Sequence, residues 1–94
     1  MKKYNSIEEV NNDFNLLEAK HFVIINSYIT GVLKIDAVKD FEKFLFEMRD
    51  AINEIEVDEE HLLEIAKIKS KIQHYNTEIL EDEELLDLAY RNQE

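Results

Sequence analysis

One stretch decides the fold: residues 36–55 read DAVKDFEKFLFEMRDAINEI. Its apolar residues recur in alternating steps of three and four, which places them on one side of an α-helix. Acidic residues occupy the remaining faces, as in a helix that is half buried and half exposed to water. We therefore predict a helix that follows an N-cap at Asp36 and buries one stripe, formed by Val38, Phe41, Leu45, Met48, Ile52 and Ile55.

The segment before it predicts a longer helix. Ser6-Ile7-Glu8-Glu9 has capping-box spacing, in which the Ser6 hydroxyl accepts from the Glu9 amide and the Glu9 carboxylate reaches back to the Ser6 amide. The chain is apolar nearly all round from Phe22 to Leu33, which is typical of a helix buried among others. We expect residues 1–35, which carry no net charge, to supply the middle of the core through the stripe Ile7, Val10, Phe14, Leu17, His21, Ile24, Tyr28 and Ile35.

The same segment leaves one alternative open. Residues 22–35 are rich in β-branched side chains, which fit strands better than helices. Asn26-Ser27 can then be the two-residue turn of a β-hairpin, although it lacks the Gly that such turns favour. If the segment is helical instead, Asn26-Ser27 and Gly31 are the expected sites of a kink or break.

Two further helices follow. Asp58 is the predicted N-cap of the third helix, whose stripe is Leu62, Ile65, Ile68, Ile72, Tyr75 and Ile79. A short last helix covers 82–91. The connections at 35–36 and 57–58 are short, so successive helices must be antiparallel neighbours.

The pattern as a whole predicts one all-α domain over 1–94. Its architecture is a small antiparallel three-helix bundle with a short fourth C-terminal helix, and about two-thirds or more of the chain is helical. The alternative is an α+β fold with a hairpin at 22–35.

Composition narrows the functional classes. The 94 residues include 11 Lys and Arg against 22 Asp and Glu, a formal net charge of −11. There is no Cys, which excludes disulfides and thiolate metal sites, and a single Gly excludes a Gly-rich phosphate loop. The longest apolar run, 22–25, is far too short to span a membrane, and a chain this acidic is repelled by nucleic-acid phosphates. We expect a cytoplasmic protein that contacts neither membrane nor nucleic acid directly.

Residues suited to catalysis or metal binding are few. Glu18-x-x-His21 puts a carboxylate and an imidazole on one helical face, but di-iron bundles use two such motifs and only one occurs here. We interpret His21 as a satisfied histidine in the core or at its boundary. No Ser lies in the context of a nucleophile elbow. The sequence therefore predicts no catalytic residue, no metal ligand and no cofactor, and we expect the chain not to be an enzyme.

The acidic residues are the strongest functional signal. They cluster in 54–60 and 81–84, which we predict at opposite ends of the bundle. Helix starts favour acids, but Asp and Glu outnumber bases twofold, which is more than capping needs. Carboxylates on a rigid surface resemble a phosphate ladder and steer basic partners into fast association. The candidate partner-binding residues are Glu56, Glu59, Glu60, Glu64, Glu81, Glu83, Glu84 and Asp87.

Two functional hypotheses from different classes follow. The first is a stoichiometric inhibitor or neutraliser of a basic, nucleic-acid-handling protein, the class of immunity proteins, antitoxins and phage anti-defence proteins that act as DNA mimics. The second is a structural or assembly subunit that self-associates through apolar helix stripes. Apolar surface left uncovered on the first helix favours the second, and a monomer rather than a homodimer in solution favours the first.

Overall fold

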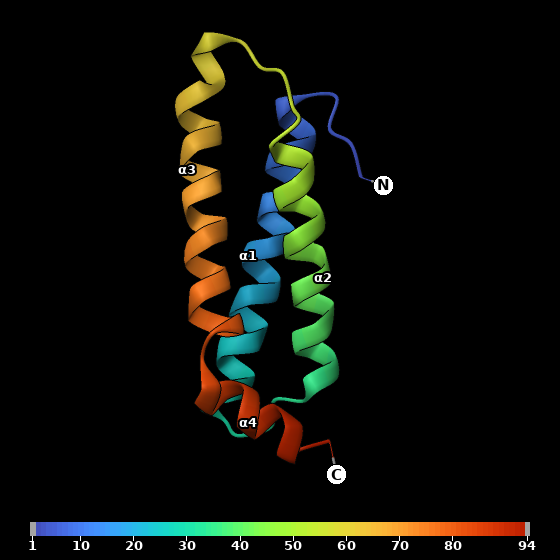
Figure 1. Ribbon diagram of the computed structural model, residues 1–94, viewed down its shortest axis with the longest axis vertical. Helices are drawn as coiled ribbons and strands as arrows, with labels where there is room; N and C mark the ends of the chain where they lie inside the picture. Colours follow the sequence, from blue (N-terminus) through green and yellow to red (C-terminus); the bar gives the residue numbers. More distant parts are fainter. Residues whose placement is uncertain (1, 94) are drawn as a thin grey trace.

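Four α-helices and one π-helical turn make up residues 2–93, the part of the chain that this computed structural model describes (Figure 1). Helix accounts for 78% of these residues and none of them forms a strand, so the predicted all-α bundle is confirmed. The first three helices run antiparallel along the 47 Å long axis, and α4 crosses the lower end (Figure 1). The elements are α1 (Ile7–Ile29), α2 (Ile35–Ile52), α3 (Glu59–Tyr75), the π turn η1 (Asn76–Leu80) and α4 (Glu83–Arg91).

A Schellman motif ends α1. Gly31 has φ +78°, the Val32 amide donates to the Ser27 carbonyl over 2.9 Å, and the Gly31 amide donates to the Tyr28 carbonyl over 3.0 Å. Glycine adopts this left-handed conformation without steric cost. The break therefore falls at Gly31, one of the two predicted sites.

The alternative hairpin at 22–35 is wrong. α1 continues through Asn26 and Ser27, because burying Ile24 against the core outweighs the weak strand preference of the β-branched residues.

The connections between helices are 30–34 and 53–58, which are longer than the joins predicted at 35–36 and 57–58.

The starts of the helices differ in detail from the sequence patterns. The Glu9 amide donates to Ser6 Oγ over 3.3 Å as predicted, but the Glu9 carboxylate accepts from the Asn5 amide over 2.8 Å instead of from Ser6. The N-cap of α2 is Lys34, because Ile35 enters the helix and is buried; Asp36 lies in the first turn, where the helix dipole favours its charge. Asp58 is the N-cap of α3 as predicted, although its side chain accepts no bond from that helix.

The core centres on α2, which contacts every other element of the described chain. Its predicted stripe is confirmed from Val38 to Ile52, while Ile55 lies half-buried in the following loop. The predicted stripe of α1 is confirmed, because Ile7, Val10, Phe14, Leu17, Ile24 and Tyr28 are buried or packed against the core. The expectation that 22–33 is buried all round is wrong, since Phe22 is 70% exposed. α1 contacts α2, α3 and α4, but its outward side remains exposed at Leu16, Phe22, Val23 and Ile29. Its buried residues are Val10, Leu17 and Ile24.

The predicted stripe of the third helix holds except at its first residue. Leu62 is 54% exposed, because α3 extends past its neighbours at this end (Figure 1). The stripe from Ile65 to Tyr75 is buried. Ile79 is also buried, but it lies in the wider π turn and not in an α-helical continuation.

The short helix α4 closes the lower end of the bundle. The Asp82 carboxylate caps it by accepting from the Glu84 and Leu85 amides, and Leu85 is fully buried. At its other end, the side-chain amide of Asn92 donates to the backbone carbonyls of Gly31 (3.0 Å) and Leu33 (2.8 Å). α4 therefore fastens the connection between α1 and α2.

Candidate interaction surfaces

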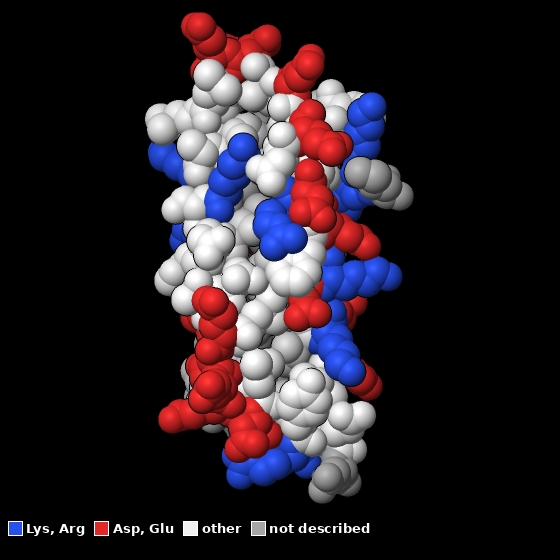
Figure 2. All heavy atoms as spheres, in the orientation of Figure 1, with Lys and Arg blue, Asp and Glu red and all other residues white. Residues whose placement is uncertain are grey.

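The predicted partner-binding residues form two groups at opposite ends of the bundle. Figure 2 shows carboxylates at its upper and lower ends, and acids mixed with bases along the side where α2 lies. The upper acidic group surrounds the start of α3, and the lower acidic group surrounds the start of α4. The upper group consists of Glu56, Glu59, Glu60 and Glu64; the lower group consists of Glu81, Glu83, Glu84 and Asp87.

Three of these acids have side-chain partners of their own. Glu64 is half-buried, accepts from the Asn11 amide over 2.9 Å and lies 3.4 Å from His61 Nδ1, so it helps to join α3 to α1. Glu60 lies 3.5 Å from the other nitrogen of His61. In the lower group, Asp87 pairs with Arg91 over 3.2 Å.

The other acids of both groups are exposed and form no ion pair within residues 2–93. They are accessible to a partner without first breaking an ion pair. These residues are Glu56, Glu59, Glu81, Glu83 and Glu84.

His21 packs at the edge of the core, which confirms its interpretation as a boundary histidine. Its ring stacks on Tyr75 with the centroids 4.0 Å apart and an interplanar angle of 19°. Its Nε2 lies 3.1 Å from Glu78 Oε2, and Nε2 of His74 lies 3.3 Å from the same oxygen. Burial and the neighbouring Glu18, which accepts from the Tyr75 hydroxyl, raise the pKa of Tyr75.

Sequence reasoning did not foresee this cluster. Glu78 lies in η1, a π turn with no local sequence signal, and it is 57 positions from His21. Across residues 2–93, no three metal-ligating side chains are arranged so that they could hold an ion.

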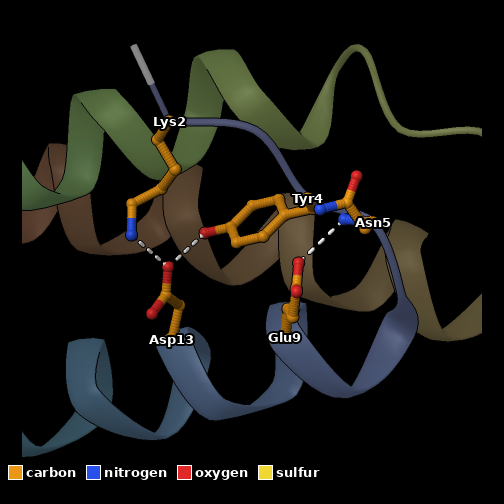
Figure 3. Close-up of polar contacts among 5 residues, drawn as sticks. All are labelled: Lys2, Tyr4, Asn5, Glu9 and Asp13. Carbon is orange, nitrogen blue, oxygen red and sulfur yellow. Dashed lines mark hydrogen bonds and ion pairs between the residues drawn. The ribbon is translucent and has the colours of Figure 1, made fainter.

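The N-terminal segment is fastened to α1 by a small polar network (Figure 3). The Tyr4 hydroxyl donates to Asp13 Oδ2 over 2.8 Å, and the Lys2 ammonium pairs with the same oxygen. The Lys2 ammonium also lies 5.4 Å from the Phe44 ring centroid, which ties the segment to α2. Tyr4 is buried, and burial followed by the nearby Asp13 carboxylate strongly raises the pKa of its phenol.

This network predicts a loss of stability at alkaline pH. The pKa of Tyr4 is 10.0 when unperturbed and is higher in the fold, so above pH 10.0 the unfolded chain releases a proton that the folded chain keeps. The stabilisation is complete below this pH and declines as the pH rises further. Tyr4→Phe should therefore show a smaller loss of unfolding free energy between about pH 9 and pH 11 in urea titrations. Equal losses in the two proteins would contradict this role of Tyr4.

The outward side of α1 exposes apolar side chains. Leu16, Phe22, Val23 and Ile29 are 52%, 70%, 57% and 76% exposed, and Val32, just after the helix, is 64% exposed. Most large apolar side chains with this exposure in residues 2–93 belong to this stretch. Between Asn12 and Val32 the only charged residues are Asp13, Glu18 and Lys20, and each contacts a side chain outside this face.

Comparisons with protein-family models, curated proteins and solved structures give no match. In residues 2–93, no helix is both long enough and apolar enough to cross a bilayer. Function is therefore inferred from this chain's own surfaces.

Proposed function

We propose that this chain is a small protein-binding module that acts by stoichiometric binding and not by catalysis, as an inhibitor or neutraliser of a partner that is basic at the contact. The observation that supports this most directly is the set of exposed, unpaired carboxylates at the two ends of the bundle. A partner rich in Lys and Arg, as nucleic-acid-handling proteins are, would complement them.

The lower acidic group is the better candidate contact. Glu83 and Glu84 lie in the first turn of α4, and Glu81 directly precedes the Asp82 N-cap. The cap and the buried Leu85 hold this turn in place, so the carboxylates have fixed spacing before a partner arrives. Pre-arranged charge lowers the entropy that must be lost on binding and raises the association rate. Upper-group Glu64 is already engaged within the fold, which leaves that end fewer free acids.

The test begins by capturing the partner from a lysate of the native host on immobilised chain and identifying it. Association rates of the purified pair are then measured at increasing salt for the wild type and for the triple variant Glu81→Lys, Glu83→Lys, Glu84→Lys. We expect the reversal to slow association about tenfold or more at low salt, because steering acts mainly on the association rate. The wild-type rate should fall with salt, since the Debye length is only ~8 Å at physiological ionic strength.

A matched control distinguishes the effect of the lower acidic group from the effect of net charge. Glu42→Lys, Glu47→Lys, Asp50→Lys makes the same charge change at exposed positions of α2. This control should keep a nearly wild-type rate, and circular dichroism should show that both variants remain helical. A rate insensitive to salt and to reversal of the lower group would reject the proposal.

A further inference from the structure

The outward side of α1 carries the repeat that pairs helices. Six exposed residues recur in alternating steps of four and three along it. This spacing forms a straight seam, and in coiled coils the equivalent positions of two helices interlock. Ala19, in the middle of the seam, is small enough to let another backbone approach closely, and Phe22 and Ile29 flank the seam. The seam consists of Asn12, Leu16, Ala19, Val23, Asn26 and Thr30.

Charge indicates what can cover this face. The chain carries a net charge of −11, yet the seam residues, Phe22 and Ile29 carry none, and the charged residues on the other flank, Asp13 and Lys20, pair with side chains outside this face. Lys20, the nearest base, is directed to Asp40 of α2 over 2.8 Å. Two copies that meet here neither bury charge nor bring their acids together at the contact. A basic partner would gain more by binding the upper or lower acidic group than by covering this uncharged face.

We propose that a second copy of this chain covers this face, and that the two α1 helices pair antiparallel about a two-fold axis. Glu8 and Glu9 lie in the first turn of α1. In a parallel pair they would lie beside their own copies, which repel them. In an antiparallel pair they lie near the uncharged end of the other α1, followed by Lys34, and the two helix dipoles are opposed.

The exposed apolar area suits such a pair. Each of the five apolar side chains from Leu16 to Val32 leaves on the order of 100 Å² uncovered, so together they expose roughly 500 Å² per chain. This is near the upper end for one apolar patch on a monomer, roughly 300–600 Å². With the Asn and Thr residues of the seam, the face approaches the ~800 Å² that each partner buries in a standard interface. No acid of the upper or lower group lies in α1, so both groups stay accessible in such a dimer. The dimer itself is the outcome that favours the hypothesis of an assembly subunit over that of an inhibitor.

The first test is the molar mass of the full chain in solution, measured by sedimentation equilibrium from low micromolar to high micromolar concentration. We expect the wild type to form a dimer and Ala19→Glu to remain monomeric across this range, because the variant buries a like charge in the seam of each copy. The matched control is Ala66→Glu, the same change at an exposed alanine within α3, which should dimerise like the wild type. A wild type that stays monomeric throughout would overturn the proposal and leave the face to a different protein chain. The proposal would also be overturned if Ala19→Glu and Ala66→Glu abolished the dimer to the same extent.

The second test is the orientation. The chain has no Cys, so single cysteines report only the designed contact. Asn12→Cys mixed with Thr30→Cys should form an oxidised heterodimer, whereas Asn12→Cys alone should not cross-link. Positions 12 and 30 are ~27 Å apart along one helix, far beyond the Cα separation of roughly 7 Å that a disulfide tolerates. Efficient cross-linking of Asn12→Cys with itself, and no heterodimer in the mixture, would overturn the antiparallel arrangement.

Discussion

Replacing Leu45 with Ala is expected to lower the free energy of unfolding by roughly 2–5 kcal/mol. Leu45 is fully buried at the middle of α2, in the same stripe as Phe41 and Met48. Truncation removes the transfer free energy of the side chain and leaves a cavity that the surrounding helices can fill only in part. Small domains have a total stability of about 5–15 kcal/mol, so the melting temperature should fall steeply.

Urea or thermal unfolding followed by circular dichroism measures this effect. Leu63→Ala is the matched control, because Leu63 is 67% exposed on α3 and its truncation leaves no cavity. The control should change stability by no more than about 0.5 kcal/mol. Similar melting temperatures for wild type and Leu45→Ala would show that α2 does not face the core.

The second large effect is expected at Gly31. Gly31→Val should destabilise the fold by about 1–2 kcal/mol or more, because a β-branched residue is strained at φ +78°. The space around the residue is open, so a new Cβ would meet no neighbouring atom and the cost arises from the backbone alone. The melting curve of the variant gives the magnitude.

Asn tests whether the left-handed conformation is the cause. Asn adopts this conformation more readily than other residues that carry a Cβ, so Gly31→Asn should recover much of the stability that Gly31→Val loses. Equal destabilisation by the two substitutions would mean that the Schellman geometry is not what Gly31 provides.

The elements that could be predicted were those whose local sequence pattern specified both the helix and its buried side. In α2, every third or fourth residue is apolar and acids fill the gaps, so the pattern specified both the helix and its buried side. In α1, the run from Phe22 to Leu33 specified apolar residues, but not which of them neighbouring helices would cover. Coverage depends on how many neighbours flank a helix, and no local pattern carries that number. The exposed side of α1 was therefore mistaken for core.

The candidate surfaces show the same division. The placement of acidic residues at both ends followed from the order of the helices. That Glu64 is held by Asn11, 53 positions away, did not follow, because such a pairing depends on the rotation of one helix against another. The cluster of His21 with Glu78 needed a π turn that has no recognised sequence signal.

The bonds from Asn92 to the carbonyls of Gly31 and Leu33 have a consequence for the order of folding. They join residues 61 and 59 positions apart, so they close a non-covalent ring that contains α2, α3, η1 and α4. The entropy lost on closing a ring grows with its length, so this ring closes cheaply only once α2 and α3 have paired and brought its ends together. The last turn of α4 is thus a late latch, whose bonds to the connection between α1 and α2 form after the three-helix body.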